Sequence, residues 1–396
     1  MKKTAIVSCY FQHNYGSMLQ AYATQMALDK LGYENETIDI SGFNHEIKKA
    51  KLRYFAKASL TSDILLSKLG MAKNVLIKKF SKNEYASLSK VRAEKFEAFS
   101  GKRFRLSPRY DSKAELGSKC EERYSNVLVG SDQLWLPGNI AADYYTLNFV
   151  PETVNSIAYA TSFGQSSLPN DSAKKAKVFL KKIKHIGVRE ESGQKLVKQL
   201  VNRNVPVVCD PTLLFTGEEW MEIQKEEPII KEKYILCYFL GNNPPHRQFA
   251  QCLKAATGCK IVALAHLDEF VKSDEGYADE MPYDVDPADF LNLIRNAEYV
   301  CTDSFHCSVF SILYKRNFFT FRRYSSNTKQ STNSRLDTLF NLTGIKGRLL
   351  TGEEKIADCI NINTDFDSVH KNLEKVREKS YEYLRVALED EGSTDL

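Results

Sequence analysis

The residue best suited to chemistry is His306, because imidazole can donate or accept a proton near neutral pH. It follows a short β-prone run, Tyr299-Val300-Cys301, and the turn-forming residues Thr302-Asp303-Ser304. Apolar residues then recur at helical spacing between Val309 and Leu313. We predict that His306 lies at a strand-to-helix turn, where open α/β sheets bind ligands and helix N-termini favour anions. A histidine packed against the sheet is the alternative interpretation.

A second polar cluster, Gly130-Ser131-Asp132-Gln133, follows an apolar strand at 126–129. Asp132 is predicted to orient or deprotonate a sugar hydroxyl, and capping of the next segment is the alternative. Ser131 is a predicted contact for the same acceptor. The ring of Trp135 suits stacking on a sugar face, although core packing fits equally well. We expect this cluster to bind a saccharide.

Arg189 follows another predicted strand, at 185–188. A guanidinium group offers a planar fork that can hold a carboxylate or a phosphate with two hydrogen bonds. Pairing with Glu190 or Glu191 on the surface is the alternative. Arg189 is therefore a candidate for binding an anionic donor.

The chain opens with an apolar strand at 4–9, a polar loop, a helix at about 18–31 and a second strand at 37–40. This order indicates the first βαβ unit of a Rossmann-like domain, but GxGxxG is absent, so a dinucleotide fingerprint is missing. Asn14, Gly16 and Ser17 suit a tight turn that exposes backbone N–H groups to an acceptor. A simple connecting turn is the alternative.

The length of 396 residues favours two domains. We predict an α/β fold with two Rossmann-like domains and a central cleft. The N-terminal domain, 1–217, carries a basic helical insertion at about 46–105 and ends in a strand at 207–209. A charged linker at 218–232 leads to the C-terminal domain, 233–364. A terminal helix at 365–390 is expected to pack back on the first domain.

The polar segment 322–335 lacks periodicity and is predicted to be a mobile loop that closes over a substrate. Arg322 and Arg323 open this loop and Arg335 ends it.

The composition, with 43% hydrophobic and 27% charged residues, is typical of a globular protein. Nine Cys occur without CxxC pairs and seven His are dispersed, so the sequence shows no metal site and indicates reduced thiols. The sequence also lacks a signal-peptide core and a long apolar run. We therefore expect a soluble cytoplasmic protein.

Positive charge is concentrated in one segment. Residues 48–105 contain sixteen Lys or Arg and four Asp or Glu, although the whole chain has a net charge of only +5. Apolar residues at helical intervals indicate basic amphipathic helices. They form either a solvated helical face or a peripheral contact with an anionic membrane or a lipid-diphosphate substrate. A nucleic-acid partner is not expected, because no recognised binding module accompanies the charge.

Six short motifs resemble those of the polysaccharide pyruvyl transferase family. They are Asn14–Ala23, Val129–Trp135, Val188–Ser192, Cys209–Thr212, Thr302–His306 and Asn333-Ser334-Arg335. The resemblance implies a GT-B fold and transfer of a pyruvyl group from phosphoenolpyruvate to a sugar of a cell-surface polysaccharide precursor, free or lipid-linked. The product would be a pyruvate ketal. The reaction requires no metal and no cofactor other than phosphoenolpyruvate as co-substrate.

Matched by position, Arg189 and His306 correspond to residues that handle phosphoenolpyruvate in that family. Two positions depart from its pattern: many members have Arg where this chain has Ser304, and Asp where it has Ser17. Either Arg335, or Arg322 or Arg323 from the adjacent loop, supplies the missing charge, or the donor differs. The alternatives are a nucleotide-sugar glycosyltransferase with the same cleft and a non-catalytic glycan- or anion-binding protein of this fold.

Overall fold

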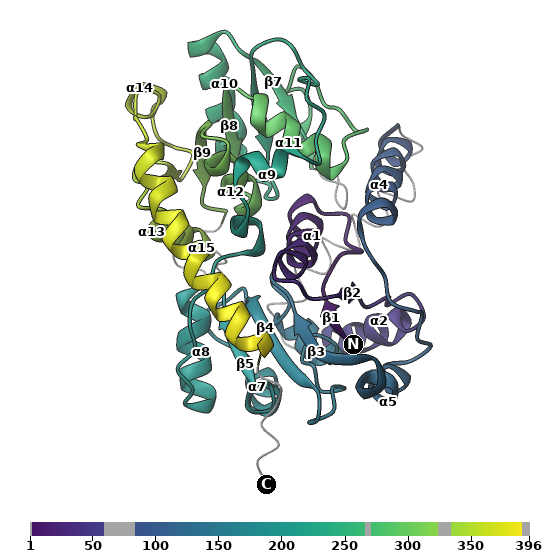
Figure 1. Cartoon of the computed structure of the whole chain (residues 1–396). Helices are drawn as coiled ribbons and strands as arrows, with labels where there is room; N and C mark the ends of the chain where they lie inside the picture. Colours follow the sequence, from purple (N-terminus) through teal and green to yellow (C-terminus); the bar gives the residue numbers. More distant parts are fainter. Residues whose placement is uncertain (1, 59–83, 266–270, 324–333, 390–396) are drawn as a thin grey trace.

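The computed structural model describes residues 2–58, 84–265, 271–323 and 334–389 (Figure 1). Within these residues the strands form two parallel five-stranded sheets, in the orders β2-β1-β3-β4-β5 and β10-β9-β8-β6-β7. The first sheet contains β1 (Lys3–Val7), β2 (Asn35–Thr37), β3 (Tyr124–Val129), β4 (Asn155–Thr161) and β5 (His185–Val188). The second contains β6 (Tyr234–Tyr238), β7 (Lys260–Ala263), β8 (Tyr299–Thr302), β9 (Asn317–Phe321) and β10 (Leu349–Leu350). The predicted α/β fold with two Rossmann-like units is confirmed.

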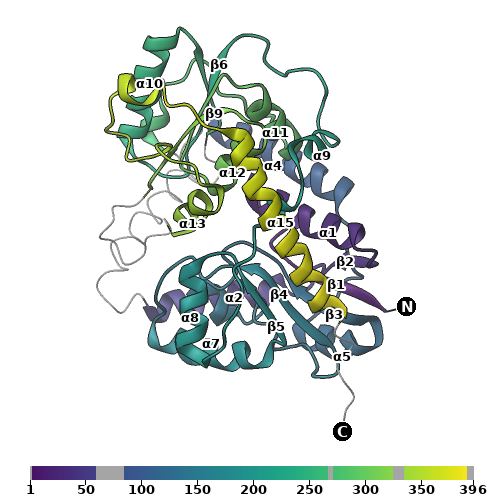
Figure 2. The same cartoon turned by 60° about the vertical axis from the view of Figure 1, so that its left-hand side comes forward.

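Helices pack against both sheets, as expected for parallel strands that must be buried on two faces (Figures 1 and 2). The first half contains α1 (Tyr15–Lys30), α2 (Asn44–Ala58), α4 (Glu84–Arg103), α5 (Lys113–Arg123), α6 (Pro137–Ala142), α7 (Asn170–Lys182), α8 (Glu191–Val201) and the 3₁₀ turn η1 (Pro211–Leu214). The second contains α9 (Gly217–Met221), α10 (Pro244–Thr257), the 3₁₀ turn η2 (Lys272–Asp274), α11 (Pro287–Asn296), α12 (Phe305–Leu313), α13 (Ser334–Thr343), α14 (Ile356–Cys359) and α15 (Phe366–Glu389).

Helix α1 lies between the two sheets and joins them. Its first residue, Tyr15, stacks on Phe290 of α11 with ring centroids 4.4 Å apart, and its hydroxyl donates to the carbonyl of Val285 at 3.0 Å. Arg92 of α4 makes a second connection, because its buried guanidinium donates to the carbonyls of Ala265 and Pro282 in the other half. These contacts fix the strand ends of one sheet relative to those of the other.

Helix α15 leaves the second half and runs along the first, as Figure 2 shows. Asn155 of β4 donates to the carbonyl of Ala387 at 2.7 Å, and Tyr383 donates to the carbonyl of Ala158 at 3.0 Å. Ser380 accepts a hydrogen bond from the backbone N–H of Cys209. The terminal helix therefore contacts the strands that position the candidate site.

Several predicted elements differ from the observed ones. Helix α1 starts at Tyr15 instead of residue 18, because the side chain of Asn14 caps it by accepting from the backbone N–H of Ser17. Strand β2 ends at Thr37, before most of the predicted 37–40 run. The predicted strand at 207–209 is a single bridge at Val207, since Pro206 has no N–H to extend the ladder.

The segment expected to be a linker contains a helix, α9, with a capping box between Thr216 and Glu219. The centre of the basic insertion and most of the predicted mobile loop at 322–335 lie outside the described residues. Among the helices that the structure describes, none has the length and apolar character needed to cross a bilayer.

Candidate active site

The carboxyl ends of the two sheets meet at a cavity of about 460 Å³. The first half contributes Ser17 and Asp132 to its wall, and the second contributes Ser304, His306 and Arg335. This volume lies within the ~300–1,000 Å³ that is usual for small-molecule sites. The structure thus brings together, around one space, residues that are separated by more than 300 positions in the sequence.

Asp132 comes after β3, and its backbone adopts a positive φ of 82°, a region that Asp tolerates better than most residues. The hydroxyl of Ser17 donates to its Oδ2 at 2.6 Å, and the guanidinium of Arg189 lies 3.6 Å from its Oδ1. Burial alone would raise the pKa of Asp132, but the charges of Arg189 and His306 outweigh it and hold the pKa below its usual value. Asp132 is therefore an ionised carboxylate in the cavity wall.

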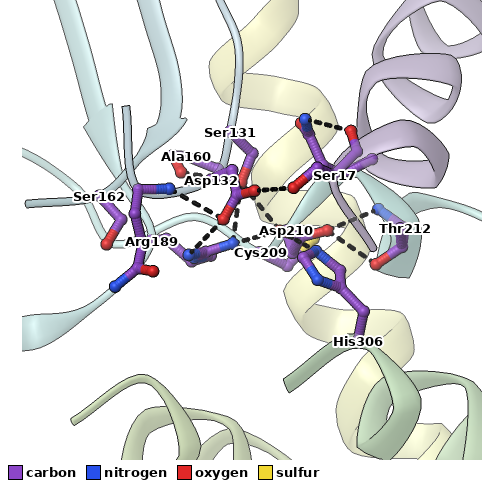
Figure 3. A network of polar contacts seen from close by, with 12 residues as sticks. Ser17, Ser131, Asp132, Ala160, Ser162, Arg189, Cys209, Asp210, Thr212 and His306 are labelled. Atoms are coloured by element: carbon purple, nitrogen blue, oxygen red, sulfur yellow. Dashed lines mark hydrogen bonds and ion pairs between the residues drawn. The ribbon is translucent and has the colours of Figure 1, made fainter. Parts of the chain in front are cut away.

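Asp210 is the centre of the polar network shown in Figure 3. Its Oδ2 lies 2.8 Å from Nη1 of Arg189, 2.8 Å from the hydroxyl of Ser131 and 3.4 Å from Nε2 of His306. Its Oδ1 accepts from the N–H and the hydroxyl of Thr212. Burial opposes ionisation, yet His306 and Arg189 hold the pKa of Asp210 far below its usual range. Asp210 is thus a fixed negative charge behind His306.

His306 is the second residue of α12, after the N-cap Ser304, whose side chain accepts from the backbone N–H of Cys307. The imidazole is 6% exposed, lines the cavity and directs Nε2 toward Asp210. A Cβ on Gly16 of α1 would lie 2.1 Å from its Nδ1. Gly16 is therefore required for the close approach of α1 to this ring, and it does not line the cavity as predicted for an acceptor contact.

Arg189 follows β5 (His185–Val188) as predicted, but its side chain does not line the cavity. Its side chain is buried among Asp210, Asp132 and Glu190, and its Cζ lies 4.8 Å from the ring centroid of Phe305. Burial raises the pKa of Glu190 in this cluster. Arg189 is not among the cavity-lining residues, so its charge holds the carboxylates in position. A direct contact with a donor stays a prediction.

The three candidate arginines of the donor side differ in their surroundings. Arg335 of α13 lines the cavity with its Cζ 5.9 Å from the ring of Phe305, and its buried Nε has no hydrogen-bond partner among the described residues. Burial, with repulsion from Arg189, lowers the pKa of Arg335 to about 10. Arg323 also lines the cavity and donates to the carbonyl of Asp303 at 3.0 Å. Arg322 instead pairs with Asp337 at 2.6 Å and is absent from the cavity wall.

Besides Gly16, two predicted acceptor contacts are wrong. Trp135 is 0% exposed, packs on Phe163 and Phe179, and donates its indole N–H to the carbonyl of Tyr145, so it cannot stack on a sugar. Ser131 is equally buried and serves Asp210. Asn14 does reach the cavity wall, as predicted, although its side chain also caps α1.

Sequence reasoning missed the roles of Asp210, Phe305 and Lys51. Asp210 stands at the end of an apolar run and directly before Pro211, which is the signal that could have marked it as a strand-end carboxylate. Lys51 of α2 lines the cavity, whereas the sequence predicts that its basic segment forms either a solvated face or a contact with an anionic membrane or a lipid-diphosphate substrate. In the described parts of the chain, no group of three or more His, Cys, Asp or Glu is arranged to hold a metal ion.

The two facing sheets, with a cavity at their carboxyl edges, define a GT-B-like α/β protein. The structure is similar to the UDP-N-acetylglucosamine 2-epimerase of Rickettsia bellii, with a TM-score of 0.52 and 11% identity over 100% of this chain and 99% of that one. It is also similar to the UDP-GlcNAc 2-epimerase of Methanocaldococcus jannaschii, with a TM-score of 0.50 and 12% identity over 98% and 99% of the two chains. Likeness at this level of identity shows the fold alone.

The sequence itself is more specific than the fold. The polysaccharide pyruvyl transferase family matches residues 14–326, and the chain belongs to this family. We find no match to the sequence among curated proteins.

Proposed function

We propose that the protein transfers a pyruvyl group from phosphoenolpyruvate to a sugar of a cell-surface polysaccharide precursor and forms a pyruvate ketal. Family membership supports a transferase of this class. The observation that carries the choice of donor is Arg335, a buried guanidinium in the cavity wall whose Nε has no partner among the described residues. Among the described residues no carboxylate forms an ion pair with Arg335, and Asp132 and Glu190 act on it only from a longer distance. A buried cation in this position favours an anionic ligand, because pairing offsets the cost of its desolvation.

The donor end of the cavity combines several groups suited to an anion. Arg335 and Arg323 supply positive charge, and α12 directs its N-terminus, capped by Ser304, into the same wall. Phosphoenolpyruvate carries a carboxylate and a phosphate on one small carbon frame. In this proposal the two arginines bind those groups and Ser304 leaves the space that an arginine side chain would otherwise fill.

The residues also suit the proton transfers of ketal formation. His306 donates a proton to the methylene carbon of the donor, which becomes a methyl group, and positive charge develops at the neighbouring carbon. One sugar hydroxyl attacks this carbon, the carbon–oxygen bond to phosphate breaks, and a second hydroxyl completes the ketal. Of the two hydroxyl protons, one returns to His306 and the other leaves with phosphate. Asp132 orients the attacking hydroxyl, and Asp210 stabilises the protonated imidazole.

The compartment and the acceptor follow from weaker observations. All cysteines of the chain lie in the described part and are free thiols, which supports a reducing, cytoplasmic setting. We propose a saccharide acceptor, free or lipid-linked, on the side of the first half. Contact of segment 48–105 with a membrane stays part of the proposal.

The test is to incubate purified protein with phosphoenolpyruvate and candidate glycans in D₂O. The proposal predicts phosphate release only when the acceptor is present, together with a ketal methyl group that carries one deuteron from solvent. Turnover of a UDP-sugar without consumption of phosphoenolpyruvate would instead support a glycosyltransferase. Ligand binding with no turnover of either donor would support a non-catalytic binding protein.

A further inference from the structure

A lysine of the first half lines the same cavity as the arginines that we propose bind the donor. Lys51 belongs to α2 of the first half, whereas Arg323 and Arg335 belong to the second. Its side chain is half-buried, and burial lowers its pKa. In the part of the chain that the structure describes, no carboxylate is close enough to offset this burial. Among the described residues, the ammonium group of Lys51 in the cavity wall therefore has no carboxylate partner.

The groups nearest to Lys51 do not neutralise it. Burial raises the pKa of the Cys9 thiol far above its usual range, so Cys9 stays uncharged. Asp132 is the acidic residue of the cavity wall, and its oxygens already interact with the hydroxyl of Ser17, the N–H of Gln133 and the guanidinium of Arg189. A partly buried ammonium without a partner is costly in a structural role, and such groups are concentrated at functional sites.

The wall around Lys51 has the character of a sugar site. Gln12 and Asn139 present amide side chains, and Phe55 and Leu136 present apolar surface. Amide groups bind hydroxyls, and apolar surface packs against a sugar ring. We infer that this end of the cavity binds a saccharide that carries an acidic group, either a carboxylate or a phosphate, and that Lys51 binds that group. The inference depends on the proposed function in assigning the donor to the arginines of the second half.

The test compares three monosaccharides that share one ring: glucose, glucuronate and glucose 6-phosphate. Their affinities are measured by NMR titration of the full-length protein without phosphoenolpyruvate. We expect at least one acidic sugar to bind more tightly than glucose. Lys51→Met should lower the affinity for that sugar about tenfold to a hundredfold, the loss expected for one charge-assisted hydrogen bond. The affinity for glucose should stay unchanged. Lys51→Arg should retain the preference. The acid that shows the effect identifies the group that Lys51 binds.

Two matched variants separate this site from other cations. Lys57→Met removes an exposed lysine of the same helix, which pairs with Asp171, and should change nothing. Arg335→Met should lower the affinity for phosphoenolpyruvate. It should leave the preference for the acidic sugar over glucose intact. Equal or absent binding of the three sugars, or a preference that is lost in Arg335→Met and kept in Lys51→Met, would overturn the inference. A failure of phosphoenolpyruvate turnover would overturn only the donor assignment, because the sugar titrations require no turnover.

Discussion

The carboxyl edges of the two sheets meet at one cavity but carry charge in different ways. On the edge of the first sheet, Arg189 lies among Asp132, Glu190 and Asp210, so positive and negative charges compensate each other inside the protein. On the edge of the second sheet, Arg335 lines the cavity and forms no ion pair with a carboxylate of the described residues; Asp132 and Glu190 act on it only from a longer distance. The charges of the first edge hold its own side chains in place, whereas the cation of the second edge is the one that we propose binds an anion.

His306 links these two edges. It belongs to α12 of the second half, yet its Nε2 approaches Asp210 of the first half at 3.4 Å. Its ring also lies against Gly16 of α1, where any larger residue would collide with it. The imidazole is therefore positioned by residues of the first half, while in the proposed reaction it acts on a donor that residues of the second half bind.

The largest expected effect comes from removing this link. His306→Ala should lower kcat for pyruvyl transfer about 10²- to 10⁴-fold, the usual contribution of a general acid or base. Asp210 keeps Arg189, Ser131 and Thr212 as partners, so the thermal unfolding midpoint should change little. His45→Ala, at an exposed position of α2, is the matched control and should retain full activity. Undiminished kcat in His306→Ala would exclude the residue from proton transfer.

At the edge of the first sheet, we predict that a single substitution lowers the free energy of unfolding. Arg189→Met would leave Asp210 and Glu190 buried without their cation, and breaking a buried pair in this way costs about 3–5 kcal/mol. Urea unfolding followed by circular dichroism measures the change. Arg385→Met, which breaks an exposed pair with Glu382, should cost less than about 1 kcal/mol. If the two variants lower the free energy of unfolding equally, Arg189 does not stabilise the buried carboxylates of the first edge.

The sequence predicts the fold better than it predicts the site. Apolar runs that end in polar clusters identify most strands of both sheets, because parallel strands are buried on both faces and ligands bind at their carboxyl ends. The same rule places His306 and Asp132 at the cavity. Five of the six motifs lie within residues 14–326, where the chain matches the family, and Asn333-Ser334-Arg335 lies beyond this range.

The rest could not be predicted because it depends on contacts between distant segments. A sequence pattern shows that Trp135 follows a strand but does not reveal that Phe163 and Phe179 surround it. Similarly, Arg189 follows a strand as expected, and only the fold shows that its guanidinium forms an ion pair with Asp210. Lys51 lies in a basic segment whose charge indicates a surface role, and its place in the cavity depends on how α2 packs.

The last prediction concerns the edge of the second sheet and the arginine that the family pattern leads us to expect at position 304. Arg335→Met should raise the KM for phosphoenolpyruvate about tenfold to a hundredfold by removing one charge-assisted contact. Arg322→Met removes a neighbouring arginine that pairs with Asp337 outside the cavity, so it should change KM by less than about threefold. If Arg335 replaces the missing charge, Ser304→Arg should partly restore KM in the Arg335→Met background. The rescue should be incomplete, because Ser304 caps α12 and losing a cap costs about 1 kcal/mol. Equal KM values in Arg335→Met and Arg322→Met would show that the donor is held elsewhere.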